Sequence, residues 1–275
     1  MSVLEKDARP RYVPTQRRTT FAGLLRSEWI KFTSVRSLTL TTAVAAVLVV
    51  GLGVLLSWGV GSQLGSIPEG APAPDTLSIS MAGAQMATLV LAAVGVIVVA
   101  GEYSTGMVRT SFAIAPARLP VVAAKAIVLA LVVTVVGAVS VLLAFLGGQA
   151  ILDSYGAGHS LTDDGVVAAL AGTVGSLVGC ALAGMGLGLI LRNTAGAICT
   201  VLAAIFVVPL VLMLVPESWG GDTIREYWFS NAMTNAQSLV EQSGYLPAGE
   251  GVLVFAVWVL ALLGIGSVLV KRRDV

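Results

Sequence analysis

Six long runs of apolar residues, separated by short polar segments, dominate the chain. Each run is long enough to cross a bilayer, because a helix rising about 1.5 Å per residue needs roughly 20 apolar residues to span the hydrocarbon. Unbroken apolar runs favour helices over a closed barrel. The runs are Leu38 to Val60, Ile79 to Ala100, Val121 to Gly147, Val166 to Leu191, Thr194 to Val215 and Gly251 to Val270. The pattern predicts an all-α polytopic membrane protein with a tail over residues 1–37 and a six-helix transmembrane domain over residues 38–275.

Basic residues set the expected orientation of these spans. Of the 16 Lys and Arg residues, all except Arg225 fall on one side of the six-span arrangement. Loops rich in Lys and Arg tend to stay in the cytoplasm. We therefore expect both termini in the cytoplasm and a multi-pass protein of the plasma membrane, the inner membrane of a bacterial cell. The span interiors are expected to lack Asp, Glu, Lys and Arg, with Lys125 counted among the bases of the inner loop.

Composition and missing motifs exclude several function classes. The chain is 56% hydrophobic and 11% charged, far from the soluble average of about 25% charged, so no separate soluble domain is expected. Its net charge of +1 gives no reason to expect nucleic acid, and the basic tail is better explained by anionic lipid. No lysine follows a glycine as in a P-loop, the glycine-rich motif that binds nucleotide phosphates. The single histidine, His159, cannot complete a metal site or a buried triad. We expect no catalytic residue, no metal site and no cofactor bound by this chain.

A proton-coupled carrier is also disfavoured, because such proteins usually hold ionisable groups within the membrane. Two inner elements remain as candidates for function. In Phe21 to Arg36, apolar residues recur at steps of three and four, which predicts an amphipathic helix lying at the membrane surface. In Gly101 to Pro120, about twenty residues separate two spans, and Met107 to Ile114 are expected to form a short helix. Glu102 is expected near Lys31 or Arg26.

Local motifs in these two elements resemble one known family. They are Ser27-Glu28-Trp29-Ile30-Lys31 with Ser34-Val35-Arg36-Ser37 before the first span, and Gly101-Glu102-Tyr103, Gly106, Arg109, Pro116, Arg118 and Ala124-Lys125 between the second and third spans. With the six-span plan, they make the chain similar to permease subunits of the ABC-2 class of ATP-binding-cassette transporters. Met107 departs from the pattern, since many relatives have Thr after the glycine.

The resemblance implies a division of labour. The inner loop 101–120 would be a coupling helix on a separate cytoplasmic ATPase, present in two copies that bind ATP and Mg, and the helix of residues 21–36 would be the connecting helix beside it. Glu102 would brace the two. Coupling residues would be Glu102, Tyr103, Gly106, Arg109 and Arg118, and connecting-helix residues would be Arg26, Trp29 and Lys31. The expected function is export of a hydrophobic or amphipathic compound. The alternative is a non-transport scaffold or assembly factor that recruits a cytoplasmic partner.

A second permease copy, identical or related, is expected to complete a central cavity. By family likeness, spans two and five would line it, with Gln85, Thr88, Phe206 and Met213 as candidate substrate contacts. Glycines in span four, Gly175 with Gly179 and Gly184 with Gly188, predict close helix packing within one subunit or between two. In the outer loop, residues 216–250, Asp222-Thr223 and Leu239-Val240 could form one or two short helices that dip toward the lipid, but the aromatic residues of this loop favour the alternative, a loop settled on the headgroups.

Overall fold

The fold is an all-α bundle, seen in a computed structural model that describes residues 20–64, 74–104 and 118–272. In these ranges six helical stretches are long and apolar enough to cross a membrane. They are α2 (Arg36–Leu64), α3 (Thr76–Ser104), α5 (Arg118–Asp153), α6 (Val166–Leu191), the stretch that begins with α7 (Thr194–Leu202) and ends with α8 (Val208–Leu212), and α10 (Ala248–Arg272). The chain is a multi-pass membrane protein, and each stretch overlaps the span predicted for it.

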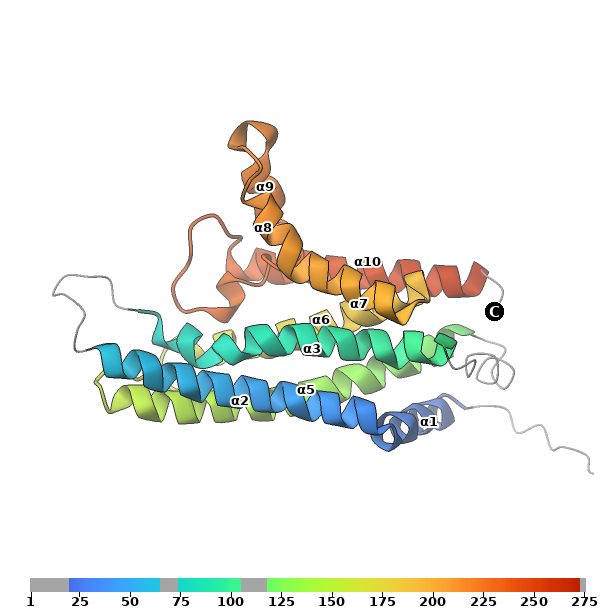
Figure 1. Cartoon of the computed structure of the whole chain (residues 1–275), viewed down its shortest axis with the longest axis horizontal. Coiled ribbons are helices and arrows are strands. Elements are labelled where there is room, and N and C mark those ends of the chain that lie inside the picture. Colours follow the sequence, from blue (N-terminus) through green and yellow to red (C-terminus); the bar gives the residue numbers. More distant parts are fainter. Residues whose placement is uncertain (1–19, 65–73, 105–117, 273–275) are drawn as a thin grey trace, which may run out of the picture.

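Helices α3 and α6 form the centre of the bundle. Helix α3 packs against α2, α5, α6 and α7, and α6 packs against α3, α5, α7 and α10 (Figure 1). Glycines make the α3–α6 contact close: a Cβ at Gly184 would overlap the carbonyl oxygen of Ala92, and a Cβ at Gly95 would overlap that of Ala181. Within the subunit, the predicted close packing of span four is therefore confirmed at Gly184, whereas a Cβ at Gly175 would meet only Met233 Cε, at 3.9 Å.

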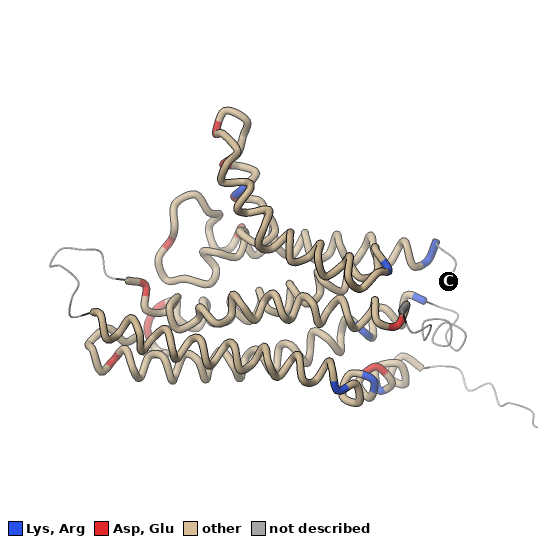
Figure 2. Tube along the Cα trace, in the orientation of Figure 1, with Lys and Arg blue, Asp and Glu red and all other residues tan. Residues whose placement is uncertain are grey.

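The charged residues separate along the long axis of the bundle (Figure 2). Arg36, Arg118, Arg192 and Lys271 lie at one end, which we call the basic end, at the right in Figure 2. Acidic residues dominate the other end. This separation agrees with the alternation of loops inferred from the bases, and the cytoplasmic location of the basic end stays a prediction based on that rule.

A short helix, α1 (Phe21–Ser34), lies at the basic end against α5 and α2 (Figure 1). The side chain of Thr20 caps its start by accepting a hydrogen bond from the amide of Gly23. Val35 ends it, because this residue is extended at φ −84° and ψ 102° before α2 begins at Arg36. The predicted amphipathic helix is confirmed in its bounds to within two residues, as a separate element from the first span.

The fifth span is less regular than predicted. A π-helical turn, Ala203–Val207, interrupts it between α7 and α8, and Pro209 follows, a residue that has no backbone N–H to donate. The indole of Trp228 donates to the carbonyl oxygen of Ala204 at 2.8 Å. Helix α8 ends at Leu212 and, with α9 (Gly221–Glu226), stands away from the bundle (Figure 1). The prediction of one span from Thr194 to Val215 therefore missed a bend.

The segment between α8 and α10 contains α9 and two short 3₁₀ turns, Glu217–Trp219 and Asn235–Gln237. One of the two short helices considered for this loop forms, at Asp222-Thr223 within α9. No helix forms at Leu239-Val240, where Ser238 donates its hydroxyl to the carbonyl oxygen of Val240. The buried Asn235 amide nitrogen lies within 3.3 Å of the carbonyl oxygens of Gln242, Tyr245 and Leu246, and it holds this segment as a loop.

Candidate functional site

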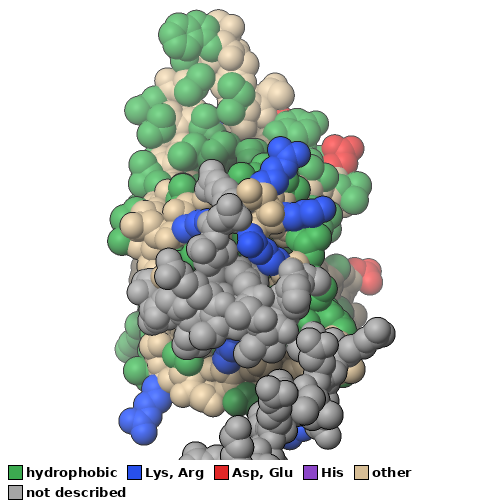
Figure 3. Space-filling view, turned by 90° about the vertical axis from the view of Figure 1, so that its right-hand side faces the viewer, with side chains coloured by type: hydrophobic (Ala, Val, Ile, Leu, Met, Phe, Trp, Pro, Cys, Tyr) green, Lys and Arg blue, Asp and Glu red, His purple; other side chains and the backbone are tan. Residues whose placement is uncertain are grey.

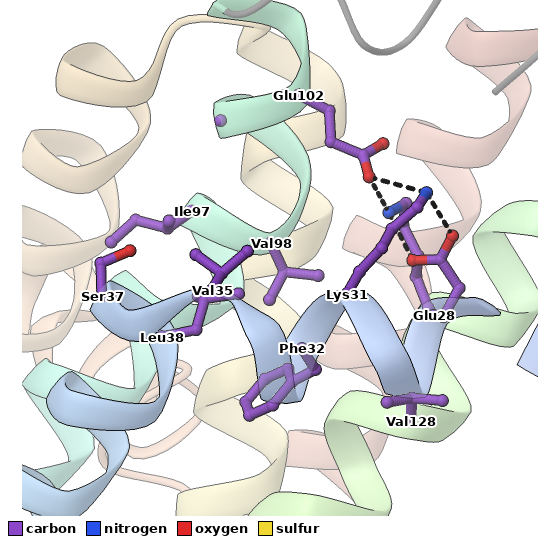
Figure 4. Close-up of a pocket in the computed structure, with 12 residues that line it drawn as sticks. Glu28, Lys31, Phe32, Val35, Ser37, Leu38, Ile97, Val98, Glu102 and Val128 are labelled. Carbon is purple, nitrogen blue, oxygen red and sulfur yellow. Dashed lines mark hydrogen bonds and ion pairs between the residues drawn. The ribbon is translucent and has the colours of Figure 1, made fainter. Parts of the chain in front are cut away.

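The candidate site is a cluster of four charged side chains at the basic end, contributed by three helices. Glu28 and Lys31 come from α1, Glu102 from the last turn of α3, and Lys125 from α5 (Figure 4). Lys31 Nζ lies 2.8 Å from Glu28 Oε1 and 3.1 Å from Glu102 Oε1. Lys125 Nζ lies 2.6 Å from Glu28 Oε2 and 2.6 Å from Glu102 Oε1. Each ammonium thus contacts both carboxylates, and the four form a closed ring of ion pairs.

Burial makes this ring important for the arrangement of the helices. The side chains of Glu28 and Lys125 are each 6% exposed, Glu102 is 12% exposed and Lys31 is 28% exposed. Removing a charge from water costs several kcal/mol unless a close partner offsets it. Because each helix supplies a charge that the other helices need, separating α1 from α3 or α5 would leave a buried charge without its partner.

The pKa of Lys31 reflects this balance. Burial alone lowers the pKa of its ammonium group, but the hydrogen bond to Glu28 and the negative charges of Glu102 and Glu28 outweigh burial. The net result is a pKa above the ordinary value of 10.5. Lys31 therefore stays protonated throughout the physiological range.

Two members of this ring depart from the pattern of the sequence. Helical periodicity separates Glu28 from the apolar face of α1, yet the Glu28 side chain is buried. Lys125 was counted as a loop base, yet it lies within α5 and is buried. The expectation that the span interiors contain no ionisable residue is therefore wrong for this position. The missed signal was Lys125 itself, since a charge four residues inside an apolar run requires an acidic partner.

The remaining predicted coupling residues have varied positions. Tyr103 lies beneath the guanidinium of Arg192, whose Cζ is 5.1 Å from the ring centroid. Arg118 begins α5 and donates through Nη1 to the carbonyl oxygen of Val270 at 2.9 Å, which joins α5 to the end of α10. Arg26 is exposed on α1, so Lys31 is the partner of Glu102. Gly106, Arg109 and the short helix expected at Met107 to Ile114 lie outside the described residues.

Arg192 also shapes the turn between α6 and α7. Its backbone is left-handed, with φ 53°, and its amide donates to the carbonyl oxygen of Gly188. Asn193 then caps α7 by accepting from the amide of Gly196 at 2.8 Å. Two residues therefore reverse the chain, and they bring the Arg192 side chain to the basic end. Figure 3 views this end and shows Lys and Arg side chains gathered on it.

The four residues proposed to contact a substrate do not share one environment. Gln85 on α3, Phe206 in the π-helical turn and Met213 just after α8 are exposed on the subunit. Thr88 is buried, and its hydroxyl donates to the carbonyl oxygen of Ala84 within its own helix.

Over the described ranges, no three His, Cys, Asp or Glu side chains are placed to hold a metal ion. Comparison with known proteins matched the chain to no family model and to no curated protein.

Proposed function

We propose that this chain is the membrane-spanning subunit of an ABC-2 type transporter, which exports a hydrophobic or amphipathic compound with energy from a separate ATPase subunit. The observation that carries the proposal is the ring formed by Glu28, Lys31, Glu102 and Lys125. It joins α1 to the two helices that flank residues 105–117, the segment expected to meet the ATPase. In the proposed complex, two ATPase copies act on two permease copies in the plasma membrane.

The physical basis of the proposal is mechanical. A force applied to the inner loop reaches α3 and α5 directly, and the ring makes α1 follow, because its separation would strand buried charges. The glycine contacts at Gly95 and Gly184 join α3 closely to α6, so a displacement of α3 carries the centre of the bundle with it. Motion at the basic end thereby becomes motion of the spans.

The test uses the whole complex. The chain is co-expressed with an ABC ATPase encoded beside it, purified in lipid, and assayed for ATP hydrolysis. We expect stable co-purification, and we expect Glu102→Gln to lower hydrolysis by the complex roughly tenfold, which corresponds to about 1.4 kcal/mol. Glu241→Gln, at an exposed loop position far along the chain, is the matched control and should leave hydrolysis unchanged.

Two results would overturn the proposal. A chain that purifies as an inert monomer and stimulates no ATPase would favour the scaffold alternative. Uptake driven by a pH gradient in vesicles that contain this chain and no ATP would establish a secondary carrier, in which the buried Glu28–Lys125 pair would be the first candidate for proton binding.

A further inference from the structure

A cavity of about 290 Å³ adjoins the ring of ion pairs at the basic end (Figure 4). Its wall is mostly apolar and includes Phe32 of α1, Ile97 and Val98 of α3, and Val128 of α5. Glu28, Lys31, Glu102 and Lys125 form its charged side. The cavity therefore lies between three helices, with hydrocarbon side chains on one side and a group of paired charges on the other.

The position of the cavity along the bundle is the second observation. Val35 and Leu38 also line it, at the junction between α1 and the first span. The apolar run of α2 begins at Leu38, while Arg36 and Lys31 lie on the polar side of that point. Bases at the ends of spans mark the headgroup level of a bilayer. The cavity thus lies where headgroups give way to acyl chains.

The charges at the cavity decide the chemistry of its occupant. Glu28, Lys31, Glu102 and Lys125 sum to zero, so the ring as a whole does not concentrate small ions of either sign. Lys31 is the most exposed of the four, and an ammonium has three donors, which suit the oxygens of a phosphate. The apolar wall, which includes Phe32 and Val98, gives an apolar chain a surface to pack against. An amphipathic molecule whose head carries both a phosphate and a cationic group matches the neutral ring, and its apolar chain matches the wall.

We propose that this cavity is a binding site for a phospholipid of the leaflet at the basic end, with an acyl chain against Phe32, Val98 and Val128 and the phosphate at Lys31. The bound lipid would fill the space between α1 and the helices α3 and α5, beside the ion pairs that already join them. The proposal does not depend on an ATPase partner, because it follows from the lining and the position of the cavity alone.

The test is photolabelling of the full chain in bilayers with a phospholipid that carries a diazirine in its acyl chain. Labelled peptides are identified by mass spectrometry. We expect labelling concentrated on the cavity-facing parts of α1, α3 and α5, and we expect it to be reduced by an excess of the same phospholipid without the diazirine. Val98→Trp, which fills the cavity, should lower this labelling roughly tenfold, a loss of about 1.4 kcal/mol of binding free energy.

Two controls keep the test decisive. Val135→Trp adds the same side chain at an exposed position of α5 and should leave the labelling unchanged. Lys31→Gln tests the phosphate contact without filling the cavity, and it should lower the amount of phospholipid retained in native mass spectrometry. Labelling spread evenly over all lipid-facing helices, or equal in wild type and Val98→Trp, would overturn the proposal. A cross-link that places residues 1–19 of this chain in the cavity would overturn it as well.

Discussion

Lys125 and Glu28 are the two buried charged residues in the described ranges of the chain, and Lys125 is the one within a predicted span. It is a base in an otherwise apolar stretch of α5, and its ammonium contacts carboxylates from two other helices at 2.6 Å each. A buried pair of this kind adds little net stability, because desolvation offsets attraction, but the loss of one partner is costly. Its main effect is to specify which helices meet at this end of the bundle.

Replacement of Lys125 should therefore destabilise the protein more than replacement of Lys31. Lys125→Met leaves Glu28 and Glu102 buried with one cation fewer, at a cost of roughly 3 to 5 kcal/mol. Lys31→Met removes a more exposed ammonium and should cost clearly less, since water can replace it. Thermal unfolding in detergent measures both, and adding Glu28→Gln to Lys125→Met should recover part of the loss. Equal midpoints for the two single variants would contradict this reasoning.

The raised pKa of Lys31 predicts a specific pH dependence. A group whose pKa is higher in the folded protein than in the unfolded protein stabilises the fold below the unfolded value, and this stabilisation is lost as pH rises through the folded value. The difference in unfolding midpoint between wild type and Lys31→Gln should stay constant from about pH 6 to about pH 9. It should shrink only above 10.5. A difference that disappears near neutral pH would show that Lys31 does not make these ion pairs.

Residue identities predicted part of this site and not the rest. The pairing of Glu102 with Lys31 could be inferred because both flank apolar runs on the same side. Glu28 and Lys125 could not be assigned by helical periodicity, which sorts residues by polarity and therefore turns every charge of α1 towards water. Glu28 is buried instead because it pairs with a charge on another helix. A single sequence does not show which charges of different helices meet.

At the level of elements, the α3–α6 pair is held together by backbone proximity rather than by polar side chains. Gly95 and Gly184 each face a carbonyl oxygen of the opposite helix. Such contacts let dispersion and packing stabilise helices in lipid, where apolar side chains gain nothing by leaving the solvent. The spacing of glycines in α6 predicted this face, because four residues bring successive glycines to the same side.

An added methyl group at Gly184 should therefore separate α3 from α6. Gly184→Ala places a Cβ against the backbone of Ala92, which cannot move away as a flexible side chain could. We expect a loss of roughly 1 to 3 kcal/mol from overpacking, measured by thermal unfolding. Gly264→Ala in α10 is the matched control, since nothing lies within 4 Å of its added Cβ. A Gly184→Ala protein as stable as the control would place the α3–α6 contact elsewhere.

The bend in the fifth span shows where apolar patterning fails. Residues 194–215 form one continuous apolar run, which length alone assigns to one straight helix. The bend comes from the π-helical turn, from Pro209 and from the indole of Trp228, which is more than twenty residues away in the sequence. Pro209 was visible in the sequence and indicates a kink, but the partner of Ala204 was not.

At the scale of the whole molecule, lipid simplifies prediction. Backbone groups have no water to bond in hydrocarbon, so each apolar run of sufficient length becomes helical, and the number of spans follows. The basic residues add an orientation. The segment after α8 carries neither constraint, because it is polar and irregular, and its loop depends on the three carbonyl contacts of Asn235.

The predicted orientation can be measured with two single-cysteine proteins. After Cys180 and Cys199 are changed to Ala, Ser27→Cys introduces a thiol on α1 and Ser160→Cys introduces one in the loop between α5 and α6, both exposed. A membrane-impermeant maleimide should label Ser160→Cys in intact cells and should label Ser27→Cys only after permeabilisation, because bases retain α1 in the cytoplasm. Labelling of Ser27→Cys in intact cells would reverse the assigned sides.

The hydrogen bond from Arg118 to Val270 has a practical consequence for work on this protein. It fastens the last turn of α10 to the first turn of α5, so the end of α10 lies beside the residue that follows segment 105–117. A fluorescent protein or affinity tag fused there would crowd the surface on which a cytoplasmic protein is expected to dock. A tag-dependent loss of activity should therefore first be checked by removing the fusion.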